Sequence, residues 1–259
     1  MMHSTTVQNK IKPILKKVFV LLFWLLVWEG VYLIVGHDIL VASPLDTFKR
    51  AFELLSTSDF WLCIANSLWH ILLGFVLAVI FAILLSLITS YSKTADSLIG
   101  ALMRVIKSAP VASFIVIALL WLKSSIASFI AFLMVVPIIW HSLSVGIKET
   151  DKNLLEMAKI YNFSFFKKLK LIYIPSIMPQ FSSAASVALG FAFKAGISAE
   201  VIGLPKDTLG IKIHDAKIYI ETADLFAVTL VIIVLSMAME KLFMLLMRRL
   251  NKKVTGGEA

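Results

Sequence analysis

Charged residues are scarce in this sequence, because Asp, Glu, Lys and Arg make up only 16% of its 259 residues. A soluble domain has roughly 25% charged and 45–50% apolar residues, whereas hydrophobic residues make up 59% here. An apolar excess of this size excludes a disordered chain and disfavours an ordinary soluble enzyme. The composition therefore predicts an integral membrane protein whose apolar side chains face lipid.

Cysteine is almost absent as well. Cys63 is the single cysteine, so an internal disulfide cannot form, and its surroundings contain no C-x-x-C or histidine spacing typical of a metal site. The sequence also lacks the G-x-x-x-x-G-K-[S/T] loop that cradles nucleotide phosphates. We therefore expect no metal and no cofactor in this chain, and any ATP that drives it must be hydrolysed by another chain.

Six apolar stretches approach or reach the ~20 residues that a helix needs to cross ~30 Å of hydrocarbon. The sequence predicts spans at residues 18–36, 67–91, 98–122, 126–145, 183–204 and 223–247. No ten-residue alternating pattern of a β-barrel is present, so the predicted fold class is an all-α polytopic bundle of six transmembrane helices. The first stretch also has the order of a signal peptide, but no cleavage site made of small residues follows closely, which favours an uncleaved helix.

The basic residues predict how the chain is oriented. Most lysines and arginines lie in segments on the side of the two termini, at 10–17, 93, 148–170 and 241–253. Cytoplasmic loops carry such an excess, so we expect both termini in the cytoplasm and a multi-pass location in the bacterial inner membrane. The net charge of +9 is then explained by topology, and a nucleic-acid partner is disfavoured. The predicted parts are a basic segment 1–17, a transmembrane domain 18–247 and a tail 248–259.

A cytoplasmic loop at residues 146–182 is long enough to be structured. Asp151 can cap a first helix on which Leu154, Ala158 and Tyr161 form one apolar stripe. Asn162 is suited to end that helix in the left-handed conformation. Ser164 can cap a second, basic helix that Pro175 is expected to stop before the chain returns to the membrane. The loop is therefore predicted to be a short helical hairpin.

The same loop carries a recognisable pattern. It reads Glu156-Met157-Ala158, three residues, Asn162, nine residues, Ile172, one residue, Ile174-Pro175. This resembles the EAA loop of ABC importer permeases, which reads E-A-A, three residues, G, nine residues, I, one residue, L-P. The spacing matches throughout, and Met157, Asn162 and Ile174 depart from the pattern conservatively.

Weaker likenesses occur in the same order along residues 40 to 250. They are Ser43-Pro44 after the first span, residues 67–75 at the start of the second, residues 107–110 in the third and Ala199-Glu200-Val201-Ile202-Gly203 near the end of the fifth. Together they are similar to the nitrate/sulfonate/taurine-type subfamily of MetI-like permeases.

The resemblance implies a permease subunit that dimerises with a second copy of itself. It also implies a cytoplasmic ABC ATPase, with Mg-ATP bound on that partner, and an extracytoplasmic solute-binding protein. The residues implied to couple the loop to the ATPase are Leu154, Glu156, Ala158, Tyr161, Asn162, Ile172 and Pro175. The implied solute is a small organic anion, sulfonate-like or nitrate-like, or a vitamin precursor.

Ionisable groups inside a bilayer are costly and usually face a bundle interior or a water-filled path. Glu200 in the fifth span is a candidate for the translocation pathway or for a paired structural carboxylate. Lys194 lies six residues earlier and about 120° around the helix. It is a candidate counter-charge for an anionic solute, or a snorkelling or ion-paired lysine. His141 in the fourth span is a third pathway candidate, or a histidine that is hydrogen-bonded within the bundle.

The sequence therefore predicts the permease subunit of an ABC importer. The alternative is an ion-coupled secondary transporter or channel, in which the charges within the membrane couple ions directly. An intramembrane enzyme is disfavoured, because the sequence contains no membrane-embedded Ser/Lys pair, paired aspartates or H-E-x-x-H motif.

Overall fold

The computed structural model describes residues 5–123 and 125–254, with side chains described within residues 16–123 and 125–252. The predicted segments 1–17 and 248–259 lie partly outside these residues. Every regular element in the described part is helical. The chain divides into a first unit of residues 1–60 and 212–231 and a second unit of residues 61–211 and 232–259.

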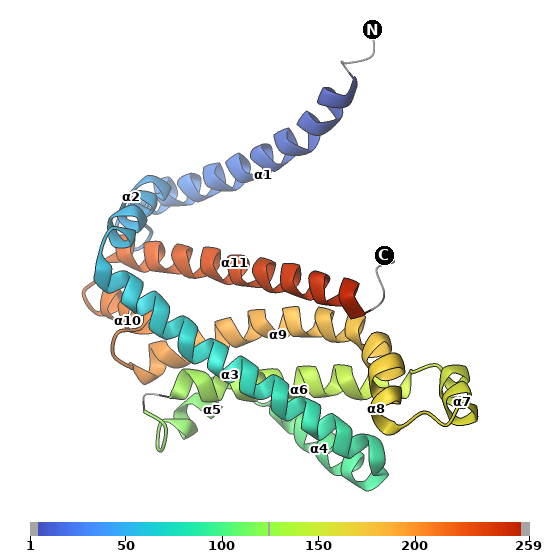
Figure 1. Ribbon diagram of the computed structural model, residues 1–259. Helices are drawn as coiled ribbons and strands as arrows, with labels where there is room; N and C mark the ends of the chain where they lie inside the picture. Colours follow the sequence, from blue (N-terminus) through green and yellow to red (C-terminus); the bar gives the residue numbers. More distant parts are fainter. Residues whose placement is uncertain (1–4, 124, 255–259) are drawn as a thin grey trace. The chain divides into compact units, whose positions relative to one another are not determined.

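The elements follow one another along the chain in Figure 1. They are α1 (Thr5–Val35), α2 (Pro44–Leu55), α3 (Ser58–Tyr91), α4 (Lys93–Ser108), α5 (Val111–Ala118), α6 (Ile126–Lys148), α7 (Lys152–Ile160), α8 (Phe165–Lys168), the π-helix η1 (Leu169–Tyr173), α9 (Ile174–Gly203), α10 (Leu209–Ile218) and α11 (Thr222–Val254).

Five of these helical stretches are long and apolar enough to cross a membrane. They are Lys16–Val35, Ser58–Tyr91, Ile126–Lys148, Phe165–Gly203 and Thr222–Lys252. The prediction of an all-α polytopic bundle is confirmed, and a sixth crossing is present if the bent pair α4 and α5 forms one span.

The third predicted span, residues 98–122, is wrong as a continuous helix. Its two halves, α4 and α5, are bent by 97° at a short break. Pro110 causes the break, because its ring clashes with a helical conformation at the preceding residue. Ala109 is accordingly extended, with φ −79° and ψ 142°. The sequence prediction missed this break because the whole stretch is long and apolar.

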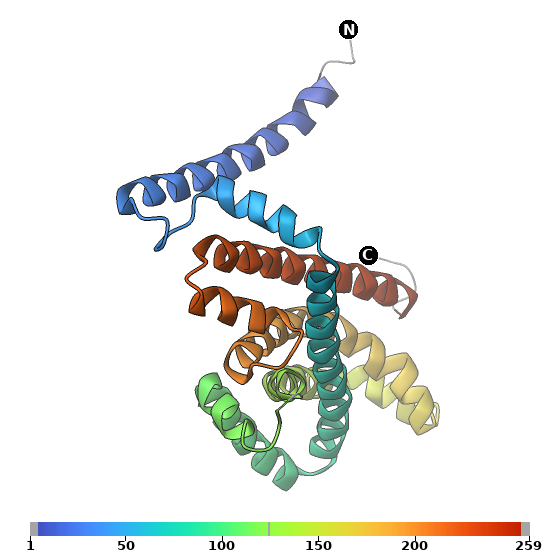
Figure 2. The same ribbon diagram turned by 90° about the vertical axis from the view of Figure 1, so that its left-hand side faces the viewer.

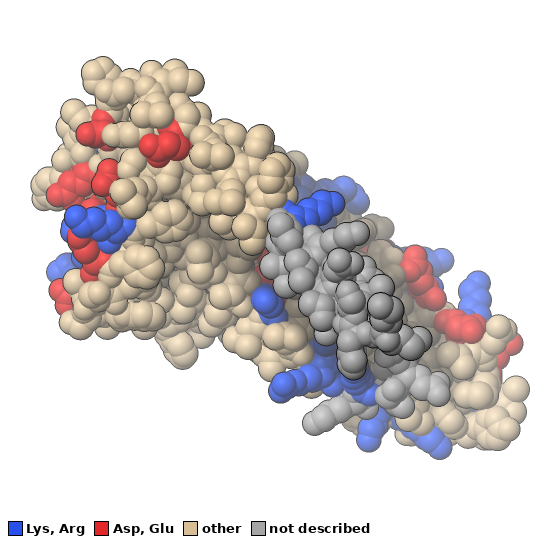
Figure 3. All heavy atoms as spheres, turned by 90° about the horizontal axis from the view of Figure 1, so that it is seen from above, with Lys and Arg blue, Asp and Glu red and all other residues tan. Residues whose placement is uncertain are grey.

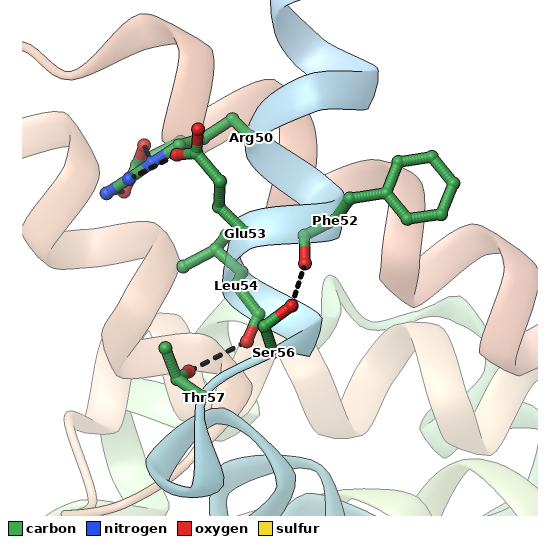
Figure 4. Close-up of polar contacts among 7 residues, drawn as sticks. Arg50, Phe52, Glu53, Leu54, Ser56 and Thr57 are labelled. Carbon is green, nitrogen blue, oxygen red and sulfur yellow. Dashed lines mark hydrogen bonds and ion pairs between the residues drawn. The ribbon is translucent and has the colours of Figure 1, made fainter.

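In the first unit, α2 is joined to the start of α11 by an arginine. The guanidinium of Arg50 hydrogen-bonds both carboxylate oxygens of Asp224, with an Nη2–Oδ2 distance of 3.0 Å, and also contacts Glu53 at 2.9 Å. Figure 4 shows Arg50 and Glu53 on α2 beside the end of that helix. These hydrogen bonds, first to Asp224 and then to Glu53, raise the pKa of Arg50 above its ordinary value. Trp28 on α1 stacks on Phe226 and donates to the carbonyl of Ala42.

In the second unit, α6 is the central helix and packs most extensively against α9. α3 crosses α6, as both ribbon views show (Figures 1 and 2). The crossing is close because Gly74 lies against the Ser128 carbonyl, where an added Cβ would lie only 2.2 Å from the oxygen. Small residues permit such close backbone approach in membrane helices.

Large apolar side chains remain exposed on the spans, including Phe19, Trp24 and Leu26 of α1. On the face shown in Figure 3, a broad area carries no charged side chain. The exposed apolar surface is therefore consistent with lipid contact.

Candidate functional site: the loop after α6 and the C-terminal end of α9

The predicted helical hairpin is present in the second unit, where α7 and α8 project beyond the ends of α6 and α9 (Figure 1). Its first helix begins where expected, because the Asp151 carboxylate accepts a hydrogen bond of 2.8 Å from the Asn153 amide. The helix ends at Ile160, and Asn162, two residues later, has φ 49°. The predicted capping role of Asp151 and the left-handed conformation of Asn162 are both confirmed.

Two backbone hydrogen bonds satisfy carbonyl groups in the last turn of α7. The amide of Phe163 donates to the Ala158 carbonyl at 2.9 Å, and the amide of Asn162 donates to the Lys159 carbonyl at 3.1 Å. These two bonds around a left-handed residue are the Schellman arrangement that ends many helices. Asn162 therefore fixes the angle at which the chain leaves α7.

The second helix of the hairpin also begins as predicted, since the Ser164 hydroxyl accepts a hydrogen bond from the Lys167 amide. It does not end at Pro175, and that prediction is wrong. Residues Phe165–Gly203 form one uninterrupted helical stretch. Pro175 is tolerated because the π-helix η1 directly precedes α9, and a π turn changes the hydrogen-bond register just where proline cannot donate.

Polar contacts at its base attach the hairpin to the bundle. Lys148 at the end of α6 pairs with Asp96 on α4 at 2.7 Å. The Glu149 carboxylate accepts a bond of 2.9 Å from Gln180 on α9. Gly146 allows this approach, because a Cβ there would lie 2.9 Å from the Gln180 side chain. The base of the loop is therefore held by three helices, α4, α6 and α9.

The apolar stripe predicted on α7 is partly buried and partly exposed. Ala158 is completely buried, whereas Leu154 and Tyr161 are exposed, Tyr161 by 70%. Met157 and Ile160 are exposed as well, Ile160 by 77%. We call Leu154, Met157, Ile160 and Tyr161 the α7 apolar patch.

The remaining predicted coupling residues hold the loop together or are open to solvent. Ile172 is buried at 2% exposure, Pro175 is half-buried and Glu156 is exposed. The sequence interpretation did not include Met157 and Ile160 among the coupling residues. Met157 is three residues from both Leu154 and Ile160, so it neighbours each of them on the helix surface.

Glu200 lies near the C-terminal end of α9 and is completely buried. Its Oε2 accepts hydrogen bonds from the Ser67 hydroxyl at 2.7 Å and from the Gly210 amide at 3.1 Å. The Ser67 oxygen in turn accepts a bond of 2.9 Å from the Leu209 amide. This arrangement favours the paired structural carboxylate over an open pathway group. The partners Ser67, Leu209 and Gly210 could not have been identified from sequence, because no local pattern links them to Glu200.

The two glycines near Glu200 occupy positions that have no room for a larger side chain. A Cβ on Gly210 would lie 2.2 Å from the Cβ of Glu200, and a Cβ on Gly203 would lie 2.9 Å from Ile126. α9 ends directly after Gly203, where Leu204 adopts φ 51°. The A-E-x-x-G pattern is thus a packed junction between α3, α9 and the start of α10.

Lys194 lies on another side of α9 from this junction. It is exposed together with Val187, Phe191 and Ser198, which follow the helical spacing of four, three and four residues. His141 on α6 is also exposed. No hydrogen bond or ion pair within the described residues joins Lys194 or His141 to Glu200, so the three pathway candidates do not form one cluster.

Comparison with known proteins finds one family whose profile matches most of the chain. Residues 71–256 match the family described as "Binding-protein-dependent transport system inner membrane component". The matched region includes the α7–α8 hairpin and, from the Glu200 junction, Glu200, Leu209 and Gly210.

Individual relatives are 22–25% identical to this chain over most of their own length. A protein of Bacillus subtilis, by name an aliphatic sulfonates transport permease, is 22% identical over 80% of this chain and 74% of its own. The nitrate import permease protein of Synechococcus elongatus is 25% identical over 77% and 76%. The formylaminopyrimidine transport permease protein of Halalkalibacterium halodurans is 24% identical over 70% and 73%.

Proposed function

The chain belongs to the family of binding-protein-dependent transport system inner membrane components, and we propose that it couples to a separate ATPase through the α7 apolar patch. As a member of this family it is a multi-pass permease of ABC importers. The proposed topology places the hairpin and both termini in the cytoplasm, as the distribution of basic residues favours.

The observation that carries the proposal is the exposure of the α7 apolar patch on a loop that is otherwise firmly held. An amphipathic helix can lay an apolar face into a partner's groove, and Ile160 and Tyr161 are more than two-thirds exposed. Asn162 fixes the direction of α7, and the contacts of Lys148 and Glu149 fix its base. A rigid projection of this kind can transmit movement of a bound ATPase to α6 and α9.

Two neighbouring exposed residues provide a matched test of this docking surface. Ile160→Ser removes an apolar side chain from the patch, whereas Lys159→Ser changes the residue beside it. The chain is purified in a gentle detergent from its native membrane, and the co-purified ATPase is measured by mass spectrometry. We expect Ile160→Ser to lower ATPase recovery about tenfold and Lys159→Ser to leave it near wild type. Equal recovery with both variants would reject the patch as the docking surface.

For the solute, we propose that the exposed side of α9 with Lys194 lines the pathway. Lys194 is nine residues from Gly203, about 14 Å along the helix, which places it well inside the span. A lysine there costs ~2.5–3.5 kcal/mol if it faces lipid, which favours a position on a water-filled path. Relatives named for sulfonate, nitrate and formylaminopyrimidine transport support a small organic anion or a vitamin precursor as solute.

The remaining partners in the proposal are a second copy of this chain and an extracytoplasmic solute-binding protein. A pathway between two copies would cover the exposed α9 surface that contains Lys194. Mg-ATP would be bound by the partner ATPase, consistent with the lack of a phosphate-binding loop in this sequence. Uptake of the proposed anionic solute by membrane vesicles is compared between Lys194→Arg, which keeps the positive charge, and Lys194→Met, which removes it. The comparison tests whether the charge of Lys194 favours anions. Equal uptake by the two variants would remove Lys194 from the pathway.

A further inference from the structure

A cavity of about 590 Å³ lies within the second unit beside the hairpin. Its walls come from the last two turns of α3, the end of α6 and the continuous stretch from α8 to α9. Between Ile83 and Tyr91 its α3 wall extends about 12 Å along the helix axis. All three walls are ends of helical stretches long and apolar enough to cross a membrane, which favours a position of the cavity near the headgroup region on the side of the loop.

The lining of the cavity has two chemical parts. Most of it is aliphatic or aromatic, with Leu87, Ile147 and Ile177 from the three different walls. Lys168 is the one charged residue among the described residues that line it. No acidic side chain faces Lys168 there, because Asp96 is paired with Lys148 and no carboxylate belongs to the lining.

This lining favours an amphipathic anion over an apolar molecule or a compact polar solute. A half-buried lysine without a carboxylate partner attracts a negative group, and the lysines in sequence beside it, Lys167 and Lys170, strengthen the local positive potential. The apolar walls require hydrocarbon to fill them. Basic pockets between membrane helices are known to hold anionic lipid headgroups.

We propose that the cavity binds an anionic membrane phospholipid, with its phosphate at Lys168 and one acyl chain between α3, α6 and α9. The lipid would also contact Phe165 and Tyr173, which belong to α8 and η1. These elements connect the hairpin to α9, so a bound lipid would stiffen the joint through which the loop moves. The inference rests on the membrane-spanning fold and not on ATPase docking.

The test measures lipid retention by the full-length chain. The chain is purified in mild detergent, mixed with dioleoyl phosphatidylglycerol or dioleoyl phosphatidylcholine, and examined by native mass spectrometry. Wild type is expected to retain phosphatidylglycerol about tenfold better than phosphatidylcholine. Lys168→Gln is expected to abolish this preference, whereas Lys170→Gln, at an exposed position outside the lining, preserves it.

A second variant tests the acyl-chain part independently of charge. Ser90 lines the cavity and is exposed, so Ser90→Phe narrows the cavity without removing a buried group. It is expected to reduce retention of both lipids while the elution volume in size-exclusion chromatography stays unchanged. Equal retention of the two lipids by wild type, or unchanged retention in both Lys168→Gln and Ser90→Phe, would overturn the proposal.

Cross-linking identifies the occupant in the native membrane. A photoreactive benzoylphenylalanine in place of Phe181, which lines the cavity, is expected to form an adduct with the mass of a phospholipid. An adduct with a peptide of a second copy, or with a solute, would show a different occupant and contradict the proposal. ATPase binding is not needed for any of these readouts, so failure here is distinguishable from failure of the docking surface.

Discussion

The Ser67 hydroxyl donates a hydrogen bond of 2.7 Å to the Glu200 carboxylate, although 133 residues separate the two along the chain. Both groups are fully buried, so the bond is made away from water and ties α3 to the end of α9. The amides of Leu209 and Gly210 complete the junction. It fixes the geometry of the second unit at the C-terminal end of α9, opposite the end that bears the hairpin.

Removing the carboxylate should therefore destabilise the protein. Glu200→Ala leaves the Ser67 hydroxyl and the Gly210 amide without an acceptor and creates a cavity, which together should cost about 3 kcal/mol. We expect the thermal midpoint of the purified chain to fall by roughly 6–12 °C. Glu200→Gln keeps an acceptor oxygen, so its thermal midpoint should fall less than that of Glu200→Ala. If Glu200→Ala is as stable as wild type, the junction does not hold α3 to α9.

A pair of glycines tests the steric side of the same junction. Gly210→Ala forces a Cβ to within 2.2 Å of Glu200, so the backbone must shift at a cost of about 1–3 kcal/mol. Gly190→Ala is the matched control, because no atom lies within 4 Å of the place its Cβ would take and alanine favours helix by up to ~1 kcal/mol. Thermal unfolding should rank Gly190→Ala at or above wild type and Gly210→Ala below it. The reverse order would contradict the packing described.

Asn162 offers a local measurement on the hairpin. The left-handed backbone conformation is about 1 kcal/mol less favourable for alanine than for asparagine or glycine. Asn162→Ala should therefore loosen the Phe163–Ala158 bond and speed hydrogen exchange of the Phe163 amide about fivefold, while Asn162→Gly should leave it near wild type. Identical exchange in the two variants would show that the positive φ does not limit the end of α7.

Substitution of Arg50 tests the ion pairs of the first unit. Its bonds to Asp224 and Glu53 are partly exposed to solvent, so their loss should cost only about 1 kcal/mol. We expect Arg50→Ala to lower the unfolding midpoint by a few degrees. Lys49→Ala, the neighbouring exposed position, should not change it. Equal shifts for both would show that the effect comes from net charge and not from the ion pair.

Features with local causes could be predicted from the sequence. Asp151, Asn162 and Ser164 act within three residues of themselves, and each caps a helix as its side-chain chemistry predicts. Most spans could be predicted because their apolar length depends only on the sequence within them. The Ser67–Glu200 junction could not be predicted, because it brings together residues that no local pattern links.

The two prolines show where local rules fail. Pro110 breaks its span because Ala109 is extended, with ψ 142°. Pro175 does not break its helix, because Ile174 before it remains helical at φ −59° and ψ −51°. The π-helix η1 accommodates the second proline. Whether a proline ends a helix thus depends on the backbone that precedes it, which a composition-based interpretation does not contain.

The most direct test of the account is a site-specific cross-link from the α7 apolar patch in native membranes. Cys63 is the single cysteine and is buried, so Cys63→Ala gives a background without thiols. Ile160→Cys in that background should form an adduct with an ABC ATPase chain. Leu120→Cys, 75% exposed beyond α5, should not form one. No ATPase adduct at position 160, or equal adducts at both positions, would contradict the account.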